Sequence, residues 1–233
     1  MLNVRIKKGK NIMLKEKQYS MEELKVMFQC NNRQQLKNKL NNYGVLFDDI
    51  DRGDQCIFDI KQITNPLKLF GVMEMHIPAQ TDFNKFRNFC YCFLNDESFR
   101  NRPDTIKEAI MKQNGKGLTR QTISRYESYL EQVDYVCMAN GNYSYYFVDR
   151  YNNKYIETNI ETYSEAWRNF YDKIAKKENS TTECFRTMRF EYGGLAKKYP
   201  KPEFNGIYKQ QLNDLNDLVC AEMEKIIQFE SDI

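Results

Sequence analysis

The stretch that decides the fold is residues 116–148, KGLTRQTISRYESYLEQVDYVCMANGNYSYYFV. Thr119 is a favoured N-cap residue, so we predict that a helix begins there and runs to about Gln132. Apolar side chains recur along it at the spacing of one helix face: Ile123, Tyr126, Leu130 and Val133. Two aromatic-rich segments follow, and the Asn140-Gly141 pair between them is typical of a tight β-turn. The stretch therefore predicts a helix followed directly by a β-hairpin.

Two further helices are expected before this stretch. The segment Asp82–Asn95 carries an aromatic stripe at helical spacing, which indicates a face buried in a core. The stripe consists of Phe83, Phe86, Phe89 and Phe93. Pro103 suits the first turn of a second helix, and the glycine turn at 114–117 separates that helix from Thr119. Residues 82–150 are thus expected to form three helices and a hairpin around one core.

A similar order is predicted nearer the N-terminus. Ser20 and Glu23 have the spacing of a capping box, which marks a helix start. The following elements are expected to be a second helix from about Asn32 to Tyr43, strands at Val45–Ile50 and Gln55–Ile60, and a polar turn at 51–54 between the strands. Residues 63–79 contain Pro66 and Pro78 and are interpreted as a connector.

After Arg150 the chain is expected to be helical. The predicted elements are a helix at 161–177, a helical segment at 184–192, a loop imposed by Gly193-Gly194 and by Pro200-Lys201-Pro202, and a last helix at 208–229. The last helix has one apolar face, which we expect to pack on its own domain, with a homodimer as the alternative.

These patterns predict an α+β protein, mostly α. It would hold tandem winged-helix-like units with small β-hairpin wings, followed by a helical C-terminal region. The expected domains are residues 1–65, 80–150 and 151–233. No apolar run reaches the length of a membrane span, so no membrane association is expected.

The order of a Phe-rich helix, a Pro103 helix, a glycine turn, the helix LTRQTISRYESYLE at 118–131 and an Asn-Gly pair resembles winged helix-turn-helix DNA-binding proteins of phage or bacterial mobile elements. The resemblance covers about residues 82–150, with a weaker copy at 19–60. It implies that a recognition helix enters the major groove of double-stranded DNA, where the base edges distinguish all four base pairs.

The resemblance places the candidate DNA-binding residues on two helices and a wing. In the central unit they are Lys116, Thr119, Arg120, Gln121, Thr122, Ser124, Arg125 and Asn142, with Asn140 and Tyr143 beside Asn142 at the wing tip. In the first unit they are Arg33, Gln34, Lys37 and Asn38. Arginine can pair with guanine or phosphate, and glutamine with adenine. The aspartates of the first hairpin would repel phosphates, so that wing is expected to point away from DNA or to meet a protein.

Charge and cysteine content restrict the function classes. The formal net charge is +3, but residues 1–40 hold ten Lys and Arg against three Glu, as expected of a surface that contacts phosphate. The seven cysteines are scattered without a CxxC pair, and the chain has one histidine, so no zinc site is expected. They are interpreted as reduced thiols of a cytoplasmic protein.

No catalytic signature is present. Neither GxxxxGK[ST] nor GxGxxG occurs, and His76 is the sole imidazole that could activate a cysteine. We therefore expect no enzyme activity, no cofactor and no metal. The first hypothesis is a transcriptional regulator or a replication or partition factor that occupies duplex DNA. The alternative is a phage-encoded protein that inhibits a host defence nuclease, with a protein partner bound by the aromatic C-terminal third.

Overall fold

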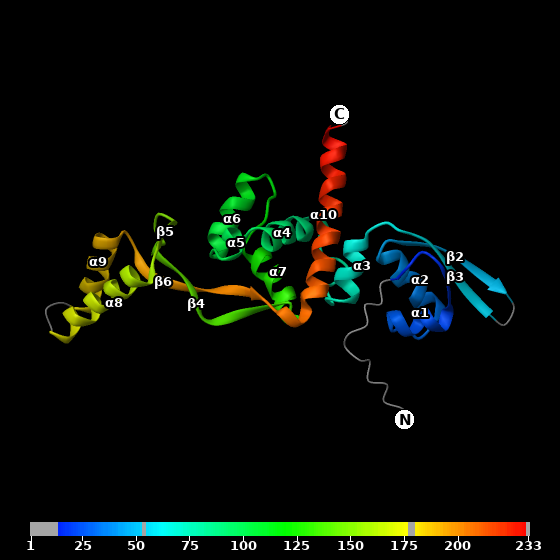
Figure 1. The fold of residues 1–233 in the computed structure, drawn as a ribbon, viewed down its shortest axis with the longest axis horizontal. Coiled ribbons are helices and arrows are strands. Elements are labelled where there is room, and N and C mark those ends of the chain that lie inside the picture. The colour runs from blue at the N-terminus through cyan, green and yellow to red at the C-terminus, as the bar shows by residue number, and fades with distance from the viewer. Residues whose placement is uncertain (1–13, 53–54, 177–179, 232–233) are drawn as a thin grey trace, which may run out of the picture. The chain divides into compact units, whose positions relative to one another are not determined.

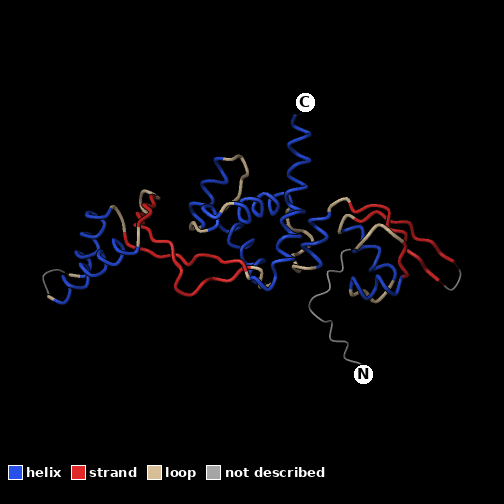
Figure 2. The backbone as a smooth tube through the Cα atoms, viewed as in Figure 1, coloured by secondary structure: helices blue, strands red, loops and turns tan. Residues whose placement is uncertain are grey.

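The computed structural model describes residues 14–52, 55–176 and 180–231. Within these residues the chain is an α+β protein, mostly α, with two three-stranded antiparallel sheets (Figures 1 and 2). It divides into two compact units. Unit 1 comprises residues 1–83 and 217–233, and unit 2 comprises residues 84–216. The basic segment at 1–13 and part of the polar turn at 51–54 lie outside the described residues.

Unit 1 is built from helices on a small sheet. In chain order its elements are β1 (Gln18–Ser20), α1 (Met21–Phe28), α2 (Arg33–Asn42), β2 (Val45–Arg52), β3 (Gln55–Ile63) and α3 (Pro66–Met73). The strand order is β1-β3-β2, so β3 pairs with both neighbours. The core lies between the helices and the sheet, where Leu24, Leu36 and Phe58 are fully buried.

Local signals explain these elements. Ser20 and Glu23 form the expected capping box, in which each side chain accepts a hydrogen bond from the backbone N–H of the other residue. Gly44 ends the α2 segment with φ +76°, and a Cβ there would lie 2.8 Å from the Thr64 Oγ1 atom. The helix, helix, strand and strand order expected at 19–60 is therefore confirmed.

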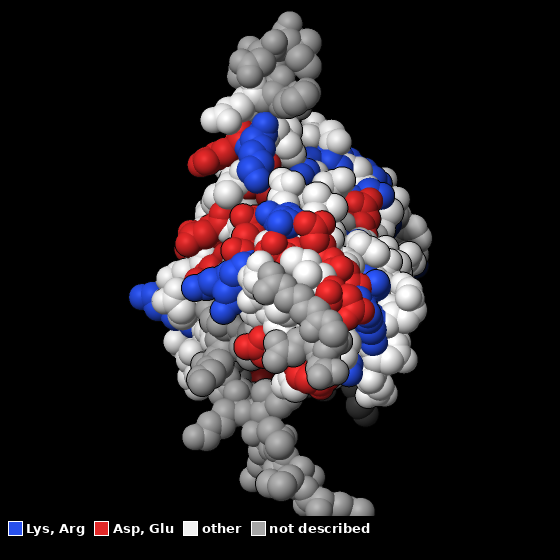
Figure 3. Space-filling model, turned by 90° about the vertical axis from the view of Figure 1, so that its right-hand side faces the viewer, with Lys and Arg blue, Asp and Glu red and all other residues white. Residues whose placement is uncertain are grey.

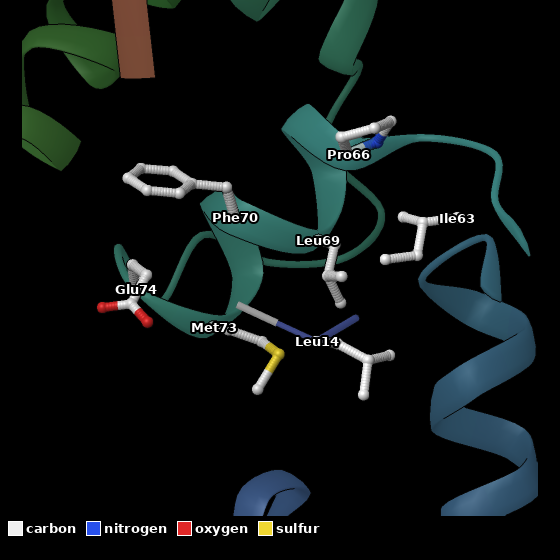
Figure 4. Close-up of a pocket in the computed structure, with 7 residues that line it drawn as sticks. All are labelled: Leu14, Ile63, Pro66, Leu69, Phe70, Met73 and Glu74. Carbon is white, nitrogen blue, oxygen red and sulfur yellow. The ribbon is translucent and has the colours of Figure 1, made fainter. Parts of the chain in front are cut away.

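The connector expected at 63–79 is wrong in one respect, because it contains α3. The Asn65 side chain accepts from the Lys68 N–H, and Pro66 occupies the first turn, where its missing N–H costs nothing. Figure 4 shows Leu14, Leu69 and Met73 lying around one small hollow beside α3. Its volume of about 20 Å³ has room for about one water molecule and for no larger ligand, so it is a gap in the apolar packing.

The helical part of unit 2 packs around aromatic rings. It consists of α4 (Phe83–Asn95), α5 (Glu97–Arg100), α6 (Asp104–Gln113) and α7 (Arg120–Gln132). The stripe predicted on α4 is buried, and Phe86, Phe89 and Phe93 have no exposed surface. Pro103 is the residue before α6 and serves as its N-cap.

The sheet of unit 2 corrects the hairpin expected at Asn140-Gly141. Residues 136–149 form one long strand, β4 (Val136–Asp149), which pairs with β5 (Lys154–Thr158) and β6 (Leu195–Phe204). The register places Met138 opposite Pro202 and Tyr143 opposite Pro200, so residues 139–142 form an irregularity within β4. Both halves of β4 pair with β6, and the Asn-Gly pair has no adjacent strands to join.

The loop expected at Pro200-Lys201-Pro202 is also wrong, since these residues belong to β6. The strand order is β5-β4-β6, which makes β6 an edge strand. A proline lacks the N–H of a ladder hydrogen bond and is tolerated at an edge. Next to this sheet lie α8 (Ile160–Ala175) and α9 (Thr181–Tyr192), which confirm the two helices expected after residue 160.

A second core cluster joins these helices to the sheet. Phe147 of β4, Phe170 of α8 and Met188 of α9 are buried together in it. Residues after 150 thus share both a sheet and a core with the strand at 136–149. The chain continues through a short 3₁₀ turn, η1 (Gly206–Tyr208), into α10 (Lys209–Ser231), close to the last helix expected. None of the described helices is long and apolar enough to cross a membrane.

Candidate nucleic-acid interface

The candidate interface is the outer face of α7. The buried residues on the inner face of the same helix fix its orientation. The Thr119 hydroxyl caps the helix by accepting from the Thr122 N–H, as the sequence predicts. On the inner face, Tyr126 is 1% exposed and lies 5.3 Å from the Phe86 ring and 5.6 Å from the Phe89 ring, centroid to centroid. Ile123 and Leu130 are fully buried on the same side. The orientation of α7 about its axis is therefore set by the aromatic core.

The outer face exposes four of the predicted site residues. Arg120, Gln121, Ser124 and Arg125 are exposed. They line one open hollow of about 570 Å³, together with Ser128, Tyr129 and Gln132 of the same helix and Asp104 of α6. Side chains with donors and acceptors thus continue from the first turn of α7 to its last.

The two arginines on this face differ in their nearest charge, since Arg120 acts on the Asp104 carboxyl group. Among the described residues no carboxylate lies within ion-pair distance of Arg120 or Arg125. Arg125 lies over the ring of Tyr126, 5.8 Å from its centroid. Burial raises the pKa of Asp104, while Lys107 and Arg120 act in the opposite direction. Asp104 is thus the one carboxylate among the described residues that line this hollow, whose other side chains are basic or neutral.

The next carboxylate along α7 points inward. Glu127 is 8% exposed and forms an ion pair with Lys107, which is 2% exposed. Burial raises the pKa of Glu127 to about 7, and the nearby Lys107 charge opposes that rise. The negative charge of Glu127 is thereby compensated inside the unit and does not face a partner of α7.

Three other predicted residues of unit 2 have partners of their own. Lys116 lies over the Tyr91 ring, 5.5 Å from its centroid, and its Nζ is 3.9 Å from the Cys92 Sγ. Asn142 donates to the Glu203 carboxylate of β6 at 2.8 Å. The Thr122 hydroxyl lies 3.0 Å from that of Thr119. The structure does not bring Asn142 to the hollow on α7, because the expected wing does not form at 140–141.

On α2 the predicted residues lie against the hairpin of unit 1. Arg33 donates from Nε and Nη2 to the two carboxylate oxygens of Asp49, at 3.0 and 2.6 Å, and from Nη1 to Asp51 at 3.1 Å. Lys37 pairs with the same Asp49. These contacts, led by Arg33, lower the pKa of Asp49 to about 2.

The face of α2 therefore carries little free positive charge. Gln34 donates to Asn38 at 3.0 Å, so their amides are engaged with each other. Figure 3 shows acidic and basic side chains interspersed on the side of the molecule that carries the β2–β3 hairpin. The hairpin aspartates, expected to point away from DNA, in part point toward α2 and offset its charges.

Several residues of the hollow were not singled out from the sequence. Tyr129 and Gln132 continue the outer face of α7, to which the sequence pattern also assigns Ser128, at spacings of three and four residues, so helical periodicity could have found them. Asp104 comes from another helix, α6. Asp49 lies on strand β2 and forms an ion pair with Arg33 of α2. No local spacing signals either contact.

A metal site receives no support from the described residues. No group of three His, Cys, Asp or Glu side chains is placed to hold a metal ion in the part of the chain that the structure describes. Compared with family models, with curated proteins and with solved structures, the chain has no match to any of them. The function is therefore inferred from the geometry of the chain itself.

Proposed function

We propose that the chain binds double-stranded DNA through the exposed face of α7. The observation that carries this proposal is a pair of arginines, Arg120 and Arg125, that share one exposed face with Gln121 and Ser124 and have no ion-pair partner in the part of the chain that the structure describes. An α-helix fits the major groove, where arginine pairs with guanine and glutamine with adenine. Such a protein would act as a regulator or a replication or partition factor of a phage or mobile element, in the cytoplasm.

Unit 1 supports the proposal less strongly. Its order of two helices and a hairpin agrees with the expected resemblance, but Arg33 and Lys37 are held by Asp49. Phosphate contacts from α2 would require these ion pairs to open. We therefore assign the main contact to α7 and an accessory contact to α2.

The experiment is a fluorescence anisotropy titration of a labelled random-sequence duplex at several salt concentrations. We expect affinity to fall steeply as salt rises, because phosphate contacts release counterions. The double variant Arg120→Ala/Arg125→Ala should bind at least about tenfold more weakly, and its salt slope should shrink by about 2. The stoichiometry of the titration also distinguishes a bound monomer from a homodimer.

The matched control is Arg168→Ala/Lys176→Ala, which removes two exposed basic side chains from the α8 region. It changes the net charge equally and leaves the α7 face intact. An equal loss in this control would show that net charge, and not the α7 face, drives binding. Absence of binding to any duplex at low salt would refute the proposal.

A second candidate is an interaction protein that inhibits a host defence nuclease, and exposed aromatic residues favour it. Phe190 of α9 is 90% exposed and Tyr171 of α8 is 61% exposed. Tyrosine is enriched among interface hot spots, and phenylalanine is enriched at protein interfaces. If this candidate is right, the chain inhibits DNA cleavage by such a nuclease, and Tyr171→Ser/Phe190→Ser relieves the inhibition while Arg120→Ala/Arg125→Ala does not.

A further inference from the structure

Unit 2 contains a polar cleft that shares no residue with the hollow on α7. It consists of two adjoining hollows of about 330 and 290 Å³, which lie where α5 and α6 face the sheet. Arg102, Tyr146 and Glu157 line both. Lys201 and Ser144 line the first, and Thr105 and Tyr155 line the second. Each hollow is close to the lower size of small-molecule sites, which is about 300 Å³.

Tyr146 lines both hollows and carries a hydroxyl group. The residue is 2% exposed, and its ring lies 6.3 Å from that of Tyr155 and 5.9 Å from that of Tyr199. The hydroxyls around it are engaged: Ser144 donates to the Asn101 carbonyl at 2.9 Å, and the Tyr155 hydroxyl lies 3.1 Å from the Thr105 hydroxyl.

The Tyr146 hydroxyl itself has no hydrogen-bond partner among the described residues. A polar atom that is buried away from solvent and has no hydrogen-bond partner lowers the stability of the folded state. In the described part of the chain no side-chain nitrogen or oxygen is in that situation. The hydroxyl oxygen of Tyr146 is therefore reachable by solvent, and the cleft is its route to solvent. A ligand in the cleft can satisfy it.

Opposite charges flank this hydroxyl. Arg102 is half-buried and Glu157 is exposed. In the described residues neither is within ion-pair distance of an opposite charge, and the same holds for Lys201. Burial raises the pKa of Tyr146 to about 12, with a further rise from Glu157 and an opposing effect of Arg102. The charges of Arg102 and Glu157 thus both act on the Tyr146 hydroxyl, and the two side chains do not form an ion pair with each other.

We propose that this cleft binds a small zwitterion of the α-amino-acid class, with its carboxylate at Arg102 and the Tyr146 hydroxyl and its ammonium group at Glu157. A simple anion would gain Arg102 and Lys201 but would be repelled by Glu157 and, in the first hollow, by Glu97. A simple cation would have the reverse problem. A molecule that carries both charges can compensate both Arg102 and Glu157, and hydrogen bonds between charged groups are the strong ones.

The test is isothermal titration calorimetry of the full chain with each of the twenty common amino acids. Acetate and ethylammonium are the probes that carry one charge only. We expect at least one amino acid to bind with a dissociation constant in the micromolar to low millimolar range, and both single-charge probes to bind at least about tenfold more weakly. Arg102→Gln and Glu157→Gln should each weaken the binding by about tenfold or more, and Tyr146→Phe by a smaller factor.

Arg168→Gln, on the exposed face of α8, is the control and should bind as the unchanged chain does. Glu157 is exposed, so Glu157→Gln tests the site without disturbing the core. The proposal is overturned if no amino acid binds at 10 mM (about −2.7 kcal/mol), or if Glu157→Gln and Arg102→Gln, folded by circular dichroism, bind as well as the control. Loss of DNA binding by α7 variants would leave this outcome unchanged, because the two sites share no residue.

Discussion

At the scale of single residues, the buried Lys107–Glu127 pair behind α7 is the most costly feature of unit 2. Removing two charges from water costs several kcal/mol per ion, and their attraction repays this only with good geometry. Lys107 also lies 5.5 Å from the centroid of the Phe93 ring and 3.9 Å from the Asp104 carboxylate. The lysine therefore has three compensating contacts, of which Glu127 is the nearest.

Breaking this pair on one side should be worse than replacing both sides. We expect Glu127→Gln to lower the free energy of unfolding by about 3–5 kcal/mol, because it leaves Lys107 buried without its main counter-charge. Lys107→Met/Glu127→Leu should be within about 1 kcal/mol of the unchanged chain or more stable. Urea unfolding measures both. A double variant less stable than Glu127→Gln would contradict this account.

Glu127 also makes stability depend on pH. Its pKa is raised from 4.5 to about 7 on folding, so between these values the folded state binds more protons than the unfolded state. The free energy of unfolding should therefore fall as pH rises through this interval. Thermal unfolding between pH 4.5 and pH 7 tests the slope, which Lys107→Met/Glu127→Leu should reduce.

Gly194 lies where α9 gives way to β6 and is required for close approach of the backbone. A Cβ at this position would be 2.6 Å from the Val148 backbone N and 2.7 Å from its carbonyl carbon. We expect Gly194→Ala to cost about 1–3 kcal/mol, because backbone atoms must move. Gly206→Ala is the control, since its Cβ would meet no atom within 4 Å. Equal unfolding midpoints for the two variants would contradict the close approach.

At the scale of elements, α2 and α7 show that the same residue types can be ion-paired on one helix and open to a partner molecule on another. Both helices carry arginine and glutamine on one face. On α2, Arg33 binds Asp49 and Asp51, whereas no strand aspartate reaches Arg120 or Arg125 among the described residues. The difference comes from β2, which places Asp49 beneath α2, and not from the helices themselves.

Asp49→Asn should release this positive charge. If α2 makes an accessory DNA contact, the variant should bind duplex more tightly, with a salt slope steeper by about 1 to 2, while the free energy of unfolding falls. Asp48→Asn is the matched control: it changes the charge equally, but Asp48 pairs with Lys61. Equal effects of both variants on the salt slope would show that α2 makes no specific contact.

Helix positions were largely predictable from local signals, and strand partners were not. Ser20, Asn32, Thr119 and Asn159 each cap the helix that follows with a side-chain hydrogen bond, within three residues along the chain. The Asn140-Gly141 pair carried the strongest turn signal and yet lies inside β4. A β-hairpin forms only when the segments on either side of the turn pair with each other, and here β6 pairs with both.

At the scale of the whole molecule, unit 2 depends on contacts between segments far apart in the chain. Both partners of β4 come after residue 150, at 154–158 and 195–204. The pairing of β4 with β5 and β6 therefore requires residues 151–204. The core cluster of Phe147, Phe170 and Met188 requires them as well.

A truncation should show this dependence. A fragment of residues 84–150 should lack protected amides at Tyr143–Val148, whereas a fragment of residues 84–216 should retain them, because only the longer one holds β5 and β6. Hydrogen exchange followed by NMR measures the protection. Protected amides at these positions in the shorter fragment would mean that β4 finds a partner locally, as the hairpin prediction had it.

The sequence by itself determined most of the helices, the caps at Ser20 and Thr119 and the polar outer face of α7, because these depend on residues three or four positions apart. Only the tertiary structure decided three further features. It paired β4 with β6, it placed Asp49 against Arg33, and it brought Arg102, Tyr146 and Glu157 to one cleft. Each of these contacts joins residues at least 11 positions apart, and which distant segments meet is set by the packing of the core.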